Sequence, residues 1–157
     1  MTQILETAIQ FFEECDWPFS KSEHETVLQT SFHGDNGEWS CYVFASEEQQ
    51  RLAFYSICPV RAAEDKRMAV AEFITSVNYG LVIGNFELDS DGGEVRFKTS
   101  IDVEGDRLST ALVKRVLLPN VAMMDMYLPG IMKVIYGDAS PIQAVAEIED
   151  GGVNQSA

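Results

Sequence analysis

The sequence predicts an α+β domain in which helices pack on an antiparallel sheet, formed by a three-strand meander and a separate hairpin. Three runs rich in β-branched and aromatic residues predict the meander, and only short polar links separate them. Links of this length join antiparallel neighbours, because a parallel crossover needs about a dozen residues or more. Segments with apolar residues at helical spacing flank the runs and predict the helical layer. The predicted strands are Thr26 to His33, Glu38 to Ser46 and Arg51 to Cys58.

The chain has the size and composition of one globular domain. It has 157 residues, of which 46 % are hydrophobic and 23 % are charged, as in typical folded proteins. We expect a single domain over residues 1–150 and a flexible C-terminal tail over residues 151–157. No apolar run approaches the ~20 residues that span a bilayer, and Glu6 stands where a signal peptide would carry a base. A soluble, cytoplasmic protein is therefore expected.

The formal net charge of −14 is concentrated in the first and last parts of the chain. Residues 1–50 contribute −9, residues 51–136 contribute −1 and residues 137–157 contribute −4. A field of this sign repels phosphate groups, so neither nucleic acid nor an anionic membrane is expected as a partner. A basic protein partner is allowed, and solubility alone is the alternative explanation of the charge.

The first predicted element is an amphipathic helix from Thr2 to Cys15, with Thr2 as its N-cap. Pro18 ends this segment, because proline cannot continue a helix. We expect Trp17 and Phe19 to fold onto the meander. The apolar stripe of the helix consists of Ile4, Leu5, Ala8, Ile9, Phe11 and Phe12.

The middle strand of the meander carries apolar side chains on both faces, which is typical of a central strand covered twice. The helices of one copy can cover only one face of the sheet. A second copy of the chain is therefore expected to close the other face. One face of this strand holds Trp39, Cys41, Val43 and Ala45, and the other holds Tyr42 and Phe44.

A helix from Arg61 to Tyr79 is predicted next, with acids in its early turns and Gly80 as its stop. The polar turn after Leu88 then predicts a hairpin, whose return strand alternates apolar and polar residues and so has one wet face. Its strands are expected at Leu81 to Leu88 and Glu94 to Val103.

The last third of the chain is predicted to be helical. Pro119 is expected to end one helix, with Asn120 capping the next, and Pro129 is expected to kink or break that second helix. Ser140-Pro141-Ile142-Gln143 is a capping box that opens a short final helix. The expected helices run from Asp106 or Ser109 to Leu118, from Asn120 to Tyr136, and from Ser140 to about Glu149.

No pattern in the sequence predicts catalysis. The cysteines Cys15, Cys41 and Cys58 are odd in number and lack CxxC spacing, which favours free buried thiols over disulfides or a metal site. His33 should lie near Glu38 and Cys41 on the neighbouring strand, which could poise a thiolate. No third residue orients the imidazole, so an ordinary strand histidine is the favoured interpretation.

Phosphate-binding and metal-binding motifs are also missing from the sequence. Asp89-x-Asp91-Gly92 lacks the glycine and glutamate spacing of a calcium loop. There is no glycine-rich phosphate loop and no HExxH motif. We therefore expect no cofactor, no metal and no catalytic residue.

Methionines crowd one late helical segment, at Met123, Met124, Met126 and Met132. The flexible, polarizable side chain of methionine fills irregular core gaps and is also overused at adaptable binding surfaces. The cluster therefore indicates either a gap-filling core or a partner surface.

Four segments carry a resemblance to a known family: Phe11-Phe12, Trp39 to Cys58, Met68 to Tyr79, and Asp125 to Met132. Together with the element order, they resemble the YbjN-like family of sensory-transduction regulators, whose fold is similar to that of type III secretion chaperones. The resemblance covers about residues 1–137 and carries no catalytic residue. It implies a two-layer α+β domain that pairs into a dimer and binds other proteins, as acidic chaperones of this fold hold an extended effector segment against apolar patches.

These observations predict a non-enzymatic protein-binding or chaperone-like regulatory module that forms a homodimer. One alternative is a small-molecule sensor or an enzyme with a pocket between the late helices and the sheet. Another is an acidic mimic that competes for a basic nucleic-acid-binding surface. The candidate partner-binding residues are Trp39, Tyr42, Phe44, Met123, Met126 and Met132.

Overall fold

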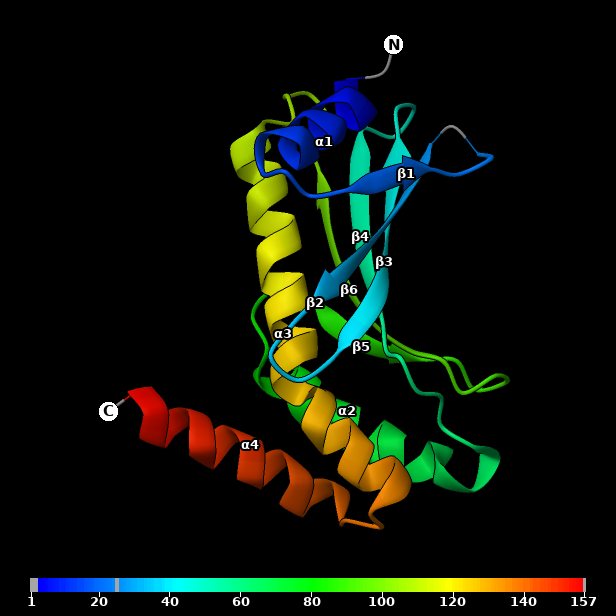
Figure 1. Ribbon diagram of the computed structural model, residues 1–157, viewed down its shortest axis with the longest axis vertical. Helices are drawn as coiled ribbons and strands as arrows, with labels where there is room; N and C mark the ends of the chain where they lie inside the picture. The colour runs from blue at the N-terminus through cyan, green and yellow to red at the C-terminus, as the bar shows by residue number, and fades with distance from the viewer. Residues whose placement is uncertain (1–2, 25, 157) are drawn as a thin grey trace.

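The computed structural model describes residues 3–24 and 26–156, and in it helices pack on a six-stranded antiparallel sheet (Figure 1). The strand order is β1-β2-β3-β4-β6-β5, so β4 and β6 join the meander and the hairpin into one sheet. The predicted α+β fold class is confirmed. The elements are α1 (Gln3–Glu14), β1 (Phe19–Lys21), β2 (Val27–His33), β3 (Glu38–Ser46), β4 (Arg51–Ile57), the 3-10 turn η1 (Glu64–Lys66), α2 (Arg67–Gly80), β5 (Asn85–Leu88), β6 (Val95–Asp102), α3 (Thr110–Tyr136) and α4 (Pro141–Ser156).

The meander has the predicted strands and turns. His33 lies opposite Glu38 and Ser46 lies opposite Arg51, so each polar link is a tight turn between antiparallel neighbours. Strand β1 was not predicted, because three residues are too few to show an alternating pattern. The expectation for Trp17 is confirmed, since its indole N–H donates to the Ser31 carbonyl at 2.9 Å. The predicted N-cap Thr2 lies outside the described residues.

Helices α1 and α3 lie on one side of the sheet, which we call the inner face (Figure 1). Alternate strand residues point towards these helices and are buried, whereas their neighbours along each strand point to the opposite, outer face. No helix in the described part of the chain covers the outer face (Figure 1). The buried inner-face residues include Leu28, Trp39, Cys41, Val43, Leu52, Phe54 and Phe97.

Helix α3 runs unbroken from Thr110 to Tyr136, with Pro119 and Pro129 inside it. The prediction that Pro119 ends a helix is therefore wrong. Ser109 caps the helix, as one of the two predicted starts, with its hydroxyl accepting from the Leu112 amide at 3.2 Å. In Figure 1 the axis of α3 changes direction between its yellow N-terminal and orange C-terminal parts. A bend is what a proline in a continuous helix produces.

Asn120 lies in the core and does not cap a helix, which corrects a second prediction. Its side-chain Nδ2 donates to the carbonyls of Phe54 and Phe97 at 2.9 and 3.1 Å, and to the Thr99 hydroxyl at 3.1 Å. The Ser56 hydroxyl donates to its Oδ1 at 2.6 Å. These bonds tie α3 to β4 and β6.

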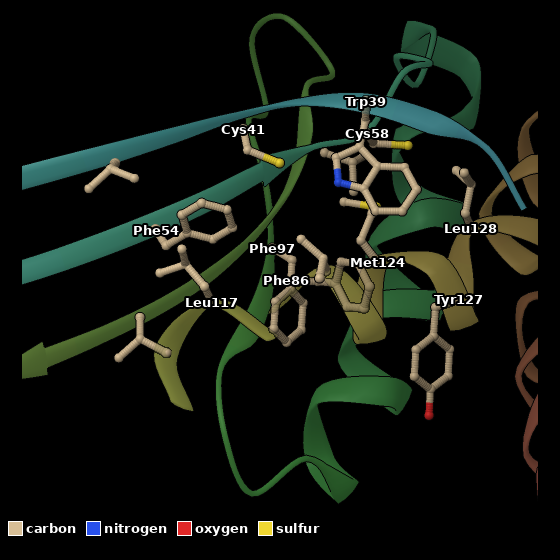
Figure 2. Packing of buried hydrophobic residues seen from close by; sticks show 14 of the residues in the cluster. Trp39, Cys41, Phe54, Cys58, Phe86, Phe97, Leu117, Met124, Tyr127 and Leu128 are labelled. Carbon is tan, nitrogen blue, oxygen red and sulfur yellow. The ribbon is translucent and has the colours of Figure 1, made fainter. Parts of the chain in front are cut away.

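Apolar side chains from α3 and the sheet fill the space around this polar network (Figure 2). Leu117 and Met124 of α3 are fully buried against the strands, and Phe86 and Phe97 stack edge to face with their ring centroids 4.8 Å apart. The indole nitrogen of Trp39 lies on the side facing Cys41 (Figure 2) and has no nitrogen or oxygen partner. This packing places Met124 in the core.

The β2–β3 turn is attached to α3 by the carboxylate of Asp125. The backbone amides of Asp35 and Asn36 donate to it at 3.0 and 2.8 Å, and the Asn36 side chain donates to the Asp125 carbonyl at 2.9 Å. A Cβ at position 34 would clash with the Asp125 carboxylate, so glycine at this position lets the carboxylate keep these bonds. The turn therefore bends away from β4 towards α3.

Helix α2 begins at Arg67, after the 3-10 turn, and ends one residue beyond the predicted Tyr79. The hairpin strand predicted from Leu81 is shorter than expected, because β5 begins only at Asn85. The Asn78 side chain of α2 pairs with both backbone groups of Phe86: its Oδ1 accepts from the amide at 2.8 Å and its Nδ2 donates to the carbonyl at 3.0 Å. This pairing covers the outer edge of β5.

Helix α4 opens at the predicted capping residue, since the Ser140 hydroxyl accepts from the Gln143 amide at 3.4 Å. The helix continues to Ser156, beyond the predicted end near Glu149. The flexible tail expected over residues 151–157 remains a prediction.

Candidate functional site

The outer face of the sheet carries an aromatic and aliphatic surface that no described helix covers. We call it the outer patch and define it by Tyr42, Phe44, Tyr55 and Ile57. Tyr42 and Tyr55 are cross-strand partners, and the rings of Phe44 and Tyr55 meet edge to face at 5.4 Å. The Phe44 side chain is 46 % exposed, and the other three residues are half-buried by their neighbours. The outer patch is therefore a candidate interaction surface.

A hollow adjoins the outer patch where strands β3 and β4 separate. Their ladder ends at Cys41 and Ser56, although β3 begins at Glu38 and pairs there only with β2. The attachment of the β2–β3 turn to α3 by Asp125 draws this end of β3 away from β4. The hollow has a volume of about 340 Å³ and is lined by Ser31, Glu38, Trp39, Ser40, Ile57, Cys58 and Pro59.

Two bases and one acid form an ion-pair cluster beside the outer patch. The Arg96 guanidinium lies over the Tyr55 ring, 4.3 Å from its centroid. Glu87 accepts from Arg96 at 2.8 Å and from Lys98 at 2.9 Å. Partial burial acts to raise the pKa of Glu87, but the hydrogen bonds from Lys98 and Arg96 outweigh it and lower that pKa. A chain of net charge −14 therefore has bases and acids side by side next to this surface.

The structure divides the six predicted partner-binding residues between the two faces of the sheet. Tyr42 and Phe44 belong to the outer patch, whereas Trp39 points to the inner face, where it is only 3 % exposed, and borders the hollow from there. The methionines lie on α3 at the inner face, where they are half-buried and pack against the core. The helical group consists of Met123, Met126 and Met132. Their role in partner binding stays a prediction.

Tyr55, Ile57 and Arg96 were not among the predicted site residues. A tight turn between Ser46 and Arg51 pairs Tyr42 with Tyr55, so the strand register could have indicated the first of them. The pairing of β4 with β6, which brings Arg96 over Tyr55, joins segments far apart in the sequence. No local sequence pattern indicates this strand pairing.

The cysteine and histidine side chains considered for catalysis do not meet. His33 lies 3.7 Å from Glu38, as expected, on exposed side chains, whereas Cys41 is buried on the inner face. Burial raises the pKa of the Cys41 thiol to about 12, despite contacts with Ser56 and Trp39 that lower it. Burial also raises the pKa of Cys58 to about 11. Neither thiol is poised as a nucleophile.

In the described part of the chain, no cluster of His, Cys, Asp or Glu side chains has the grouping that would hold a metal ion. None of the described helices combines the length and the apolar character that crossing a bilayer requires.

The fold is an α+β domain of the type III secretion chaperone-like class, and solved structures of that fold match this chain. The chain belongs to the family described as "Putative bacterial sensory transduction regulator", the YbjN family, whose profile matches residues 2–131. The predicted family is thus confirmed. No curated protein sequence matches the chain.

Three solved structures illustrate the likeness. YbjN from E. coli, described as "a putative transcription regulator", has a TM-score of 0.60 at 10 % identity, over 79 % of this chain and 87 % of that one. A chain of the ExsC–ExsE complex has a TM-score of 0.57 at 15 % identity, over 82 % and 96 %. A chain of the HopA1–SchA chaperone–effector complex has a TM-score of 0.52 at 17 % identity, over 78 % and 91 %. At these identities the likeness shows a shared fold.

Proposed function

We propose that this protein is a non-enzymatic, chaperone-like binding module that holds an apolar segment of another protein against the outer patch and the adjoining hollow. The observation that carries the proposal is the aromatic surface on the side of the sheet that no described helix covers. The family and the chaperone–effector complex of similar fold support a protein partner. The cytoplasmic location expected from the sequence remains a prediction.

The shape and charge of this surface favour an extended segment. The outer patch follows neighbouring strands β3 and β4, and the hollow could accept one partner side chain at its end. Two bases and one acid lie beside the patch, so an uncharged segment meets no strong local field of either sign there.

The proposal includes a homodimer, for which the chain offers a second apolar surface on α2 and the loop after it. Tyr79 and Val82 are 95 % and 97 % exposed, and Met68 and Ile83 are also exposed. We propose that two copies pair through this α2 surface, which leaves the outer patch for the partner. Pairing through the outer patch, as expected from the sequence, is the competing arrangement.

Single charged substitutions distinguish these arrangements. Phe44→Glu places a charge on the outer patch, Val82→Glu places one on the α2 surface, and Gln49→Glu adds the same charge in the exposed β3–β4 turn as a control. In sedimentation velocity at micromolar concentration we expect a dimer for the wild type, Phe44→Glu and Gln49→Glu, and a monomer for Val82→Glu. Dissociation by Phe44→Glu alone would instead place the second copy on the sheet.

Retention of a protein from a cell extract tests partner binding with the same variants. Wild type and Gln49→Glu should retain a common protein from an extract of the native cells, and Phe44→Glu should lose it. Retention should survive about 0.5 M salt, because burial of apolar surface is not screened. A steep loss with salt would favour the acidic mimic of a nucleic-acid-binding surface. A strict monomer that retains nothing would contradict the whole proposal.

The small-molecule alternative requires a pocket between the late helices and the sheet, but packed side chains fill that part of the core. Between α3 and the sheet, Leu117 and Met124 are fully buried against Phe54 and Phe97 (Figure 2). A metabolite that raised the melting temperature by several degrees in a thermal-shift screen would nevertheless require a ligand site.

A further inference from the structure

The C-terminal helix α4 lies across α2 and α3 at the lower end of the molecule in Figure 1. Its C-terminal half extends beyond the rest of the chain in this view. The match to the family profile ends at residue 131, before α4 begins at Pro141. Helix α4 is therefore an addition to the part of the chain that the family profile matches.

Helix α4 packs into a groove between α2 and α3. A Cβ on Gly130 would lie 2.5 Å from Ile148 Cδ1 and 2.8 Å from the Phe73 ring, so the missing side chain of Gly130 lets α4 approach closely. On α3, the Tyr127 hydroxyl and the Lys133 ammonium donate to acids of α4 at 3.4 and 2.9 Å. We call it the α4 groove and define it by Phe73, Tyr127, Gly130 and Lys133.

The side of α4 that fills the groove is small and narrow. Among its described side chains, Ala144 and Val145 are buried and Ile148 is half-buried, a stripe at i, i+1 and i+4. Glu147 and Glu149 supply the flanking acids. Helix α1, of comparable length, buries two phenylalanines by contrast. The apolar contact that holds α4 is thus small for its length.

Other features of α4 also indicate weak attachment. The Lys133–Glu147 ion pair has both side chains about half exposed, with relative exposures of 57 % and 47 %, so solvent screens it. The helix includes Gly151, and glycine lowers helix propensity. The short connector before α4 holds Asp138 in a left-handed conformation with φ of 52°, which a non-glycine residue adopts at some cost.

We propose that the α4 groove is a second binding site, which α4 occupies in cis and which an amphipathic helix of a partner protein occupies when α4 detaches. The partner helix would carry small or branched aliphatic residues at i, i+1 and i+4 with acids at i+3 and i+5, because α4 itself shows that this pattern fits. The groove lies on α2 and α3, whereas the outer patch lies on β3 and β4, so this site is separate from the surface proposed to hold the partner segment.

The test uses the full-length chain and a fluorescent synthetic peptide of residues 139–157 as the probe. Val145→Glu with Ile148→Glu in the full-length chain should release its own α4 and leave the groove intact. Fluorescence anisotropy should show that the peptide binds this variant about tenfold or more tightly than wild type, because cis occupancy lowers the apparent affinity. A peptide that carries the same two substitutions should not bind.

Two further measurements test the Lys133 contact and the weak attachment of α4. Lys133→Glu in the released variant should weaken the peptide several-fold, because it replaces the partner of Glu147 on an exposed side chain. In wild type, the amides of α4 should exchange hydrogen at least about tenfold faster than the buried amides of α3. Loss of the folded state in the released variant, equal binding to wild type, or exchange of α4 and α3 as one unit would each overturn the proposal.

Discussion

Replacement of Asn120 by alanine removes the polar link between α3 and the sheet. The side chain is fully buried, and it makes four hydrogen bonds, to Ser56, Thr99 and the carbonyls of Phe54 and Phe97. After the substitution, the Ser56 hydroxyl keeps only a contact with the Cys41 sulfur, at 3.7 Å. A cavity also replaces the amide group.

The expected loss of stability follows from these contacts. Each net hydrogen bond contributes about 0.5–1.5 kcal/mol, and a buried polar group left without its partner costs about 1–3 kcal/mol. Carbonyls within the ladder can keep a second partner, so we expect a total loss of about 3–4 kcal/mol. For a domain of this size each kcal/mol lowers Tm by about 2–4 °C, which gives a decrease of about 6–16 °C.

Urea unfolding followed by circular dichroism measures this loss. Leu118→Ala, at an exposed position on the same helix, is the matched control and should change stability much less. Asn120→Asp keeps an acceptor for Ser56 but loses the donors, and its carboxylate would face two carbonyls. The stability that Asn120→Asp loses relative to wild type should increase as the pH rises above about 4. The reason is that the fold raises the pKa of that buried acid above its unfolded value.

A double-mutant cycle with Ser56→Ala provides the decisive comparison. Because the two side chains share a hydrogen bond, the cost of the double substitution should be smaller than the two single costs together. A loss below about 1 kcal/mol for Asn120→Ala, with simple additivity to Ser56→Ala, would refute the assignment of the network as the link between α3 and the sheet.

Three other changes test separate contacts. Asp125→Ala should speed hydrogen exchange at the β2–β3 turn amides and cost about 1–2 kcal/mol, and unchanged protection would refute the attachment of that turn. Gly93→Ala should prevent stable folding or lower Tm strongly, because φ is +75° and a Cβ would lie against a backbone carbonyl. A thiol reagent at about pH 8 should modify exposed Cys15 alone in the native protein and all three cysteines in denaturant, since burial raises the pKa of Cys41 to about 12 and of Cys58 to about 11. These thiols favour folding while protonated, so stability should fall as the pH rises above about 9.

Local patterns predicted the parts of the fold that local contacts decide. Short polar turns and alternation gave the meander, and the 3.6-residue period with capping residues gave the helix starts at Ser109 and Ser140. Long-range contacts decide what was missed. Strand β1 depends on pairing with β2, and the place of Asn120 in the core depends on its bonds to strands far away in the sequence.

The residues of the candidate site also differ in whether local patterns or long-range contacts place them. Tyr42 and Phe44 follow from alternation within one strand, so they could be predicted. Arg96 reaches Tyr55 only through the pairing of β4 with β6, which the sequence does not encode locally. The hollow beside the patch depends on Asp125 drawing the β2–β3 turn towards α3, a contact across about 90 residues of chain.

The side chain of Asn78 has a consequence for assembly. Because its amide occupies both backbone groups of Phe86, the short β5 strand offers no free pair at that residue to the strand of another molecule. Sheets of successive molecules cannot join through this contact, so edge-to-edge fibre growth is blocked on one flank. A sheet that exposes aromatic side chains on one face is thereby protected from aggregation along that flank.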